Sequence, residues 1–203
     1  MYMNRGWIGF AIIVIIILAI GGWVAGTYNT LVALDQQVQS QWGTVESVYQ
    51  RRADLIPNLV ATVKGVANFE KSTYIAVANA RAKVGQVTVN AGPNAYNNPA
   101  AFSQFEQAQA GLSSALARLL VVVENYPDLK ANQNFLDLQS QLEGTENRIA
   151  VERRRYNEVA QTFNTTRLSF PTTIVAGFFG DRFNQKPYFK AQEGSQNAPK
   201  VNL

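Results

Sequence analysis

The sequence predicts an all-α protein in which an N-terminal transmembrane helix leads into an elongated antiparallel bundle of three to four long helices. Two observations predict this fold class. No Asp, Glu, Lys or Arg occurs between Arg5 and Asp35, and much of this interval is strongly apolar. After it, apolar residues recur at alternating steps of three and four, which is typical of amphipathic helices and coiled coils. Alternating apolar and polar residues form no stretch of useful length, so we expect almost no β-strand.

The transmembrane helix is predicted over residues 7–26. The 18 residues from Trp7 to Val24 carry no charge, and as a helix they span about 27 Å, close to the ~30 Å of a hydrocarbon core. A tryptophan stands at either end, where such side chains favour the headgroup level. The alternative is a cleaved signal peptide, but its apolar stretch is usually ~7–15 residues long, and Ala25-Gly26-Thr27 matches an A-x-A cleavage site poorly. We therefore expect a retained, single-pass anchor in the lipid bilayer.

The charges flanking the anchor favour one orientation. Arg5 lies on the amino-terminal side, whereas the first basic residues on the other side are Arg51 and Arg52. Those two lie beyond the ~15–20 residues that normally influence topology. The amino terminus is therefore expected in the cytoplasm, with the bundle outside it.

The first helix beyond the anchor is predicted over about residues 28–83, with a kink at Pro57. A proline inside a helix removes one hydrogen bond, and the apolar stripe keeps its phase through it. The part of this stripe from Leu31 to Val45 would lie on a stalk and need a covering partner, such as a second copy of the chain. Residues 84–99 contain Gly, Pro and Asn in groups and are predicted to be a loop. The stripe comprises Tyr28, Leu31, Val38, Trp42, Val45, Tyr49, Ile56, Leu59, Val63 and Val66.

Two further helices are predicted over residues 99–126 and 128–168. Asn98-Pro99 combines a capping residue with a proline at the first helical position, which is typical of a helix start, and Pro127 ends the second long helix. An apolar, uncharged segment over 170–180 completes a domain of residues 28–180. Residues 1–6 are a short flank, and the polar residues 181–203 are predicted to be an extended or mobile tail.

The composition excludes several classes of chemistry. The chain has no cysteine and no histidine, so it cannot form disulfides, thiolate metal sites, a thiol nucleophile or a Ser-His-Asp triad. We predict no catalytic residue, no metal and no cofactor, and hence a non-enzymatic protein. The net charge of +4 is mild, and no nucleic-acid-binding motif accompanies it.

Charged residues within the helical stripes are the candidate site. Arg52 falls in phase between Tyr49 and Ile56, while Glu152 falls on the stripe of the last helix with Glu146 nearby. A buried charge is costly unless it is paired, so we expect Arg52 to pair with Glu152 or Glu146 in a structural polar seam. The alternative is a ligand site or a pair of catalytic carboxylates, to which Asp54 could contribute.

Two further groups are candidate interaction surfaces. A basic cluster lies on the last helix, and its alternatives are a solvated helix face or a contact with anionic lipid or an acidic partner. The segment from Phe170 to Phe179 either caps the end of the bundle or forms an exposed apolar patch for a partner or a second membrane contact. The residues concerned are Arg148, Arg153, Arg154, Arg155, Phe178 and Phe179.

Long strings of residues resemble the LemA family, in order along nearly the whole chain after the anchor. The strings are Tyr28-Asn29-Thr30-Leu31-Val32 with Trp42, the run from Tyr49 to Val60, Val63-Lys64-Gly65, Glu124 to Ala131, Asn134-Phe135-Leu136, Leu142 to Ile149, Arg153 to Asn157, Phe170-Pro171 and Ala198-Pro199-Lys200-Val201.

The resemblance implies a bacterial protein, held in the cell (inner) membrane by its amino terminus, folded as a long helical bundle and without an established enzymatic activity. Its implied partners are envelope membrane proteins of the TPM-domain type or metallopeptidases of the HtpX type. Many relatives carry a lipoprotein cysteine where this chain has Gly26-Thr27, which agrees with a domain outside the cytoplasm.

Three functions are compatible with these features. The favoured one is a scaffold or adaptor for envelope protein assembly. The alternatives are a self-associating structural or membrane-shaping oligomer and, least favoured, a hydrolase that uses Asp54, Glu146 or Glu152.

Overall fold

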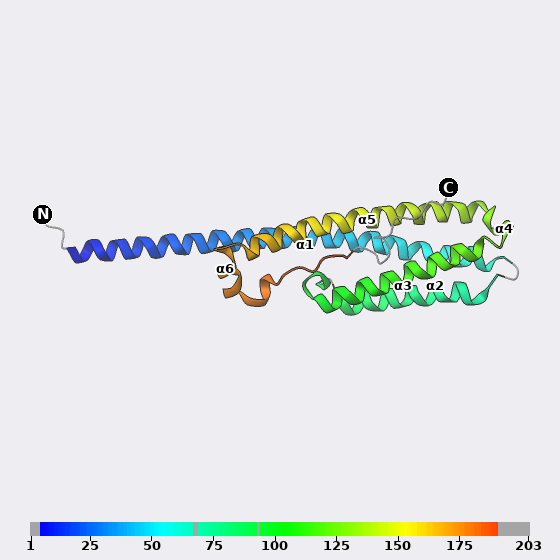
Figure 1. Cartoon of the computed structure of the whole chain (residues 1–203), viewed down its shortest axis with the longest axis horizontal. Helices are drawn as coiled ribbons and strands as arrows, with labels where there is room; N and C mark the ends of the chain where they lie inside the picture. The colour runs from blue at the N-terminus through cyan, green and yellow to red at the C-terminus, as the bar shows by residue number, and fades with distance from the viewer. Residues whose placement is uncertain (1–4, 67–68, 93, 191–203) are drawn as a thin grey trace, which may run out of the picture.

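The chain is helical along almost all of its length (Figure 1). The computed structural model describes residues 5–66, 69–92 and 94–190, and these residues contain no β-strand. The all-α class predicted from the sequence is thereby confirmed. The elements in chain order are α1 (Arg5–Lys64), α2 (Lys71–Ala91), the 3₁₀ turn η1 (Ala95–Asn97), α3 (Pro99–Val123), α4 (Pro127–Lys130), α5 (Gln133–Leu168), α6 (Thr172–Phe178) and the 3₁₀ turn η2 (Gly180–Phe183).

Helix α1 unites the anchor and the body in one element of 60 residues, about 90 Å long at ~1.5 Å per residue. Its first part projects alone from the rest of the molecule (Figure 1). This part is long and apolar enough to cross a membrane, and none of its most apolar stretch is buried. A helix that exposes apolar side chains all round is suited to lipid rather than to water, which makes this part of α1 a candidate membrane span.

Beyond the anchor, α1 becomes amphipathic and packs along α5, while α2 packs along α3 (Figure 1). The helical stripe of α1 forms the core, since eight of its members are at most 5% exposed, while Tyr28 at its start is partly exposed. The eight are Leu31, Val38, Trp42, Val45, Tyr49, Ile56, Leu59 and Val63. The stretch from Leu31 to Val45 is covered by residues of the same chain, including Ile149, Tyr156 and Phe163 of α5. It therefore needs no second copy to bury it.

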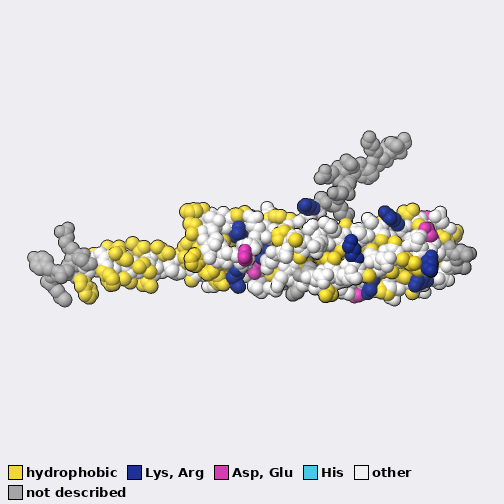
Figure 2. Space-filling view, turned by 90° about the horizontal axis from the view of Figure 1, so that it is seen from below, with side chains coloured by type: hydrophobic (Ala, Val, Ile, Leu, Met, Phe, Trp, Pro, Cys, Tyr) yellow, Lys and Arg dark blue, Asp and Glu magenta, His cyan; other side chains and the backbone are white. Residues whose placement is uncertain are grey.

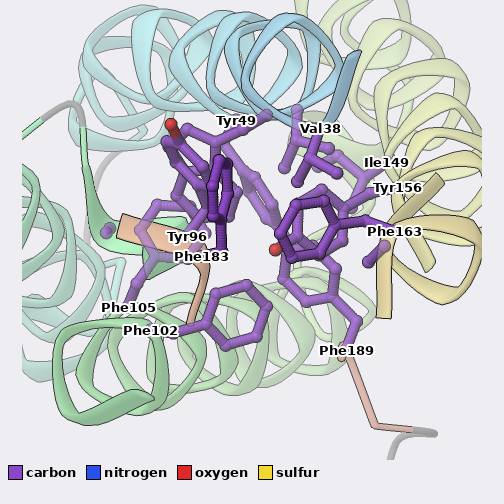
Figure 3. Close-up of a cluster of buried hydrophobic side chains, with 14 of the residues drawn as sticks. Val38, Tyr49, Tyr96, Phe102, Phe105, Ile149, Tyr156, Phe163, Phe183 and Phe189 are labelled. Carbon is purple, nitrogen blue, oxygen red and sulfur yellow. The ribbon is translucent and has the colours of Figure 1, made fainter. Parts of the chain in front are cut away.

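The half of the core nearer the anchor is aromatic. Figure 3 shows side chains from α1, α3, α5 and the segment after α6 converging on one cluster. Trp42 lies at its centre, with ring centroids 5.1 Å from Phe105, 5.5 Å from Phe102 and 5.7 Å from Tyr156. Rings at these separations and tilts contribute more than their buried area alone.

The predicted helix over residues 28–83 is wrong at its end, and so is the predicted loop over 84–99. Helix α1 ends at Lys64, just before Gly65, and α2 begins at Lys71 and continues to Ala91. Packing overrides local propensity here, because Val77 and Val84 are seven residues apart on α2 and are both buried. The stop comes at Gly92, whose φ of 63° suits glycine and whose N–H donates to the Thr88 carbonyl.

Pro57 lies inside α1 with its ring exposed. Because proline has no backbone N–H, the carbonyl of Ala53 loses its donor in the helix. The Arg81 Nε of α2 donates to this carbonyl at 2.9 Å. The bond that the proline removes is thus replaced by one that joins α2 to α1.

Helix starts in the second half of the chain follow capping rules. Helix α3 begins at Pro99, after Asn98, whose side chain accepts from the N–H groups of Ala100 and Ala101. The predicted helix over 128–168 is instead two elements, the single turn α4 and the long α5. The side chain of Asn132 caps α5 by accepting from the N–H of Phe135.

The predicted tail over residues 181–203 needs correction for its first ten residues, and residues 191–203 lie outside the described part. After η2, residues 184–190 form an extended strap that runs back along the body. Phe183, Lys186 and Phe189 are each at most 5% exposed. The strap is therefore part of the fold, and composition failed to predict this because the buried residues are separated by pairs of residues that are not buried, and one of them is a lysine.

Candidate functional site

Arg52 forms the centre of a buried polar cluster in the middle of the body. It lies on the core stripe of α1 and is 1% exposed. Its Nη1 donates to Ser113 Oγ of α3 at 2.8 Å and to Glu146 Oε2 of α5 at 2.9 Å. Its Nη2 donates to the side-chain oxygen of Gln109 at 2.6 Å and to the backbone carbonyl of Gln109 at 3.3 Å. One guanidinium therefore joins three helices.

The cluster is buried on one side and open on the other. The side chain of Glu146 is 45% exposed, against 2% for that of Arg52. Water can solvate the carboxylate but not the guanidinium, whose Nε makes no hydrogen bond to any described residue. Removing Glu146 should therefore harm the fold more directly than its own exposure suggests, because it would leave a buried cation without a counter-charge.

Two hollows between α3 and α5 meet at this ion pair. The smaller, of about 200 Å³, has a largely apolar surface that includes four leucines: Leu59, Leu116, Leu120 and Leu142. The larger, of about 650 Å³, lies toward the strap and is lined by Tyr49, Ala110, Ile149, Glu106, Arg153 and Lys190. Together they form a groove, apolar at one end and charged at the other, with Arg52 at its base. We call it the α3–α5 groove.

The other predicted members of the polar seam lie elsewhere. Asp54 is exposed and accepts from Gln50 Nε2 at 2.7 Å. Glu152 accepts from Gln41 Nε2 at 2.7 Å and pairs with Arg155 at 2.8 Å. Two residues along a helix turn the chain by ~200°, which places Asp54 on the far side of α1 from Arg52. The three carboxylates proposed for a hydrolase therefore do not converge.

The arginines of α5 are divided among different partners. Arg153 donates to the Lys190 carbonyl at 2.6 Å, lies 4.8 Å from the centre of the Phe189 ring and pairs with Glu106 at 3.6 Å. Arg154 and Arg155 pair with acidic residues of α5 itself. Only Arg148 faces solvent with no described contact of its side chain. Arg153 thus acts within the fold by holding the strap.

A second buried charge, Lys186, was missed in the sequence. It lies on the strap, is 2% exposed and pairs with Asp35 of α1 at 2.5 Å. Its Nζ also donates to Asn97 and lies over the rings of Tyr96 and Phe163, at 5.0 Å and 4.6 Å from their centres. Burial lowers the pKa of Lys186, and the bond to Asp35 opposes this shift.

The sequence does contain a signal for the pair of Asp35 and Lys186. Asp35 falls in phase between Leu31 and Val38 on the same stripe that predicts a buried Arg52. A charge on a core stripe requires an opposite charge from elsewhere, but the distance along the chain to Lys186 hides the partner.

Two asparagines of α5 hold the strap by its backbone. The amide of Asn164 donates to the Lys186 carbonyl and accepts from the Lys186 N–H, and Asn157 pairs with Phe189 in the same way, all at 2.8–2.9 Å. Seven helical residues span about 10.5 Å, and three extended residues span about 10 Å. The two spacings match, so both asparagines can bind the strap at once.

Burial also governs the ionisation of the core tyrosines. It raises the pKa of Tyr49, Tyr96 and Tyr156. The hydroxyl of Tyr156 makes no hydrogen bond to any described residue.

Among the described residues, no group of three or more His, Cys, Asp or Glu is placed to hold a metal ion.

A helical body on a helix that is long and apolar enough to cross a membrane defines the class of a membrane-anchored helical protein. The LemA family model matches residues 41–203, and the chain belongs to this family. It is 27% identical over 201 residues to magnetosome proteins MamQ 1 and MamQ 2 of Paramagnetospirillum magneticum, covering 89% of this chain and 72% of each relative. It is 25% identical over 170 residues to protein LemA of Metamycoplasma hominis, covering 82% of this chain and 73% of the relative.

Proposed function

We propose that this protein is a membrane-anchored, non-enzymatic scaffold that binds another envelope membrane protein through the α3–α5 groove. The observation that carries the proposal is the single helix α1, which forms both the anchor and the central stripe of the body. A body joined to its anchor without a flexible link holds its binding surface at a fixed distance from that anchor and in a fixed orientation to it, which is what a scaffold requires.

The groove supplies the binding surface. Its apolar end, with Leu116, Leu120 and Leu142, suits the apolar face of a partner helix or segment, as in helix-in-groove recognition. The half-exposed Glu146, held in place by Arg52, would bind a basic or amide group of that partner. A charge fixed beside an apolar surface favours specificity.

The family resemblance suggests the kind of partner. A membrane protein of the TPM-domain type or an HtpX-type metallopeptidase is the candidate, with the body outside the cytoplasm of a bacterial cell. That orientation can be tested by labelling single cysteines with a membrane-impermeant reagent in intact cells, because the chain has no native cysteine. Labelling at the exposed Ser140 of α5 but not at Asn4 is expected, and the reverse would place the body in the cytoplasm.

The binding function is tested by photocrosslinking in intact cells. A photoreactive amino acid replaces Leu120, which lines the groove, or Val121, the neighbouring residue that is 70% exposed outside it. We expect one discrete adduct from position 120, containing an envelope membrane protein, and none from position 121. The adduct should disappear when Leu142→Arg fills the groove with a charge. Equal crosslinking from both positions, or an adduct unaffected by Leu142→Arg, would contradict the proposal.

A further inference from the structure

Large apolar side chains are exposed together at one place on the body. Phe170 is 82% exposed, Ile174 60% and Phe178 85%. No charge occurs between Arg167 and Asp181. We call Phe170, Ile174 and Phe178 the apolar ledge; they are spaced four residues apart, and Leu168 and Phe179 beside them are also exposed.

The ledge is held rigidly in its exposed position. On the other side of α6, Val175 and Ala176 are buried in the body. Phe179 packs against Tyr28 of α1, with ring centroids 4.7 Å apart, and Phe183 lies 5.5 Å from the same ring. The ledge residues therefore remain outside the core because the opposite face of α6 already occupies it.

The position of the ledge along α1 is informative. Tyr28, on which Phe179 at the end of α6 packs, follows Trp23 by five residues, or about 7.5 Å of helix. Trp23 is the tryptophan that we expect at the membrane interface. Figure 1 shows α6 at the end of the body where the anchor begins, and Figure 2 shows hydrophobic side chains gathered at that same end. The ledge thus lies at the end of the apolar part of α1, close to where we expect the helix to leave the bilayer.

In the part of the body that the structure describes, the other large apolar side chains that are exposed are distributed over several elements. Ile75, Val89, Val121, Leu136 and Tyr188 are exposed on α2, α3, α5 and the strap. Single exposed apolar residues are normal, whereas a contiguous group marks a contact surface.

We propose that the apolar ledge inserts into the interface of the same bilayer that α1 crosses, as a second membrane contact beside the anchor. The occupant of this surface is lipid, because the ledge continues the apolar surface of the anchor at the level of its interfacial tryptophan. Short apolar faces of this kind enter the boundary between headgroups and acyl chains to a depth of about 5–10 Å. Arg182, which lies over the Tyr28 ring at 5.7 Å, is exposed beside the ledge, where a lipid phosphate would lie.

The experiment uses the full chain in vesicles of phosphatidylcholine and phosphatidylglycerol. Single cysteines carry the fluorophore NBD at position 178 on the ledge or at position 121 on the body, which are exposed to similar extents. A third variant, Thr173→Cys, labels α6 while keeping every ledge side chain. Lipids with a nitroxide near the top of the acyl chain quench fluorophores in the interface, and iodide quenches those in water. A label at Ile13 reports on the anchor itself.

We expect labels at 173 and 178 to be quenched by the nitroxide lipid and at least fivefold less by iodide than the label at 121. Iodide quenching equal to that at 121 would place the ledge in water and overturn the proposal. Protection from both quenchers would also overturn it, because a second protein copy or a partner would then cover the ledge. The proposal rests on α1 spanning the membrane, and the label at Ile13 tests that span separately. If the nitroxide quenches the label at Ile13 while the ledge is exposed to water, only the insertion of the ledge is refuted. If iodide quenches the label at Ile13, the membrane span of α1 is refuted as well.

Discussion

The bond between Arg81 and the Ala53 carbonyl exists because Pro57 leaves that carbonyl without a helical donor. We therefore predict that replacing Arg81 destabilises the fold when Pro57 is present and has little effect when it is absent. Arg81→Met keeps most of the side-chain volume but removes the Nε–H donor. A hydrogen bond to a charged group is worth about 1.5–3 kcal/mol, and the lower end applies because Arg81 is partly exposed. In a chain of this size, 1.5 kcal/mol lowers Tm by about 3–6 °C.

The same change should be nearly harmless once residue 57 has an N–H. In Pro57→Ala, the new N–H donates to the Ala53 carbonyl within α1, so the carbonyl keeps a partner when Arg81 is replaced. No cavity results, because the proline ring is exposed. We expect Arg81→Met to cost less than about 0.5 kcal/mol in this background, which is a coupling of about 1 kcal/mol.

Thermal unfolding of the four detergent-solubilised proteins, followed by circular dichroism at a helical wavelength, measures the coupling. Arg51→Met, an exposed change on α1, is the control and should leave Tm within about 1 °C of the parent. Equal losses from Arg81→Met in both backgrounds would refute the reasoning, because the arginine would then act independently of the proline.

Three further predictions concern the polar cluster, the strap and the core. Glu146→Gln should lower the free energy of unfolding by about 2 kcal/mol, less than the ~3–5 kcal/mol for a fully buried pair, because the carboxylate is half exposed. In the double variant with Arg52→Met, most of this extra loss should disappear. Additive losses of the two changes in thermal melts would contradict the pairing. Asn164→Ala should release the strap, so hydrogen exchange of residues 184–190 should accelerate at least ~10-fold, as loss of about 1.4 kcal/mol requires, while exchange in α2 and α3 stays unchanged. Burial raises the pKa of three tyrosines above the ordinary value near 10: Tyr49, Tyr96 and Tyr156. Their contribution to stability is therefore fully present below pH 10 and is lost above it, where only the unfolded tyrosines ionise. Above pH 10 the free energy of unfolding should fall by up to about 4 kcal/mol per pH unit, or ~1.4 kcal/mol for each tyrosine. Below pH 10.5 the lowered pKa of Lys186 opposes this fall by ~1.4 kcal/mol per pH unit, because the folded lysine has lost a proton that the unfolded one keeps. Denaturant titrations between pH 9 and 11 measure the slope, and Tyr156→Phe should reduce it by the contribution of one tyrosine.

The helical stripe made the core of α1 predictable, because an amphipathic helix buries the same face wherever its partners come from. The same stripe placed Arg52 in the core before any contact was known. It did not distinguish Glu146 from Glu152 as the partner, since that choice depends on the axial register of α5 against α1. Register results from packing over the full length of both helices rather than from local sequence.

Two features could not be predicted because tertiary contacts decide them. The turn after Lys64 interrupts a pattern whose phase continues to Val66, so periodicity alone reads through it. The strap has the composition of a tail, and it is ordered by contacts with distant parts of the chain: the amides of Asn157 and Asn164 bind its backbone, and Asp35 pairs with Lys186. An extended segment with no apolar run of its own gives no local signal of burial.

Because one continuous helix runs from the anchor into the body, the two incline together. From Ala25 to Lys64 the helix continues for about 60 Å at ~1.5 Å per residue, so any inclination of the anchor moves the far end of the body in proportion. Transmembrane helices incline by ~20° on average, which displaces that end sideways by about 20 Å. A thinner bilayer increases the inclination, and a thicker one reduces it. The lateral position of the body's far end over the membrane surface is therefore set by the thickness of the lipid around the anchor. The ledge beside Tyr28 lies near the point about which the helix inclines.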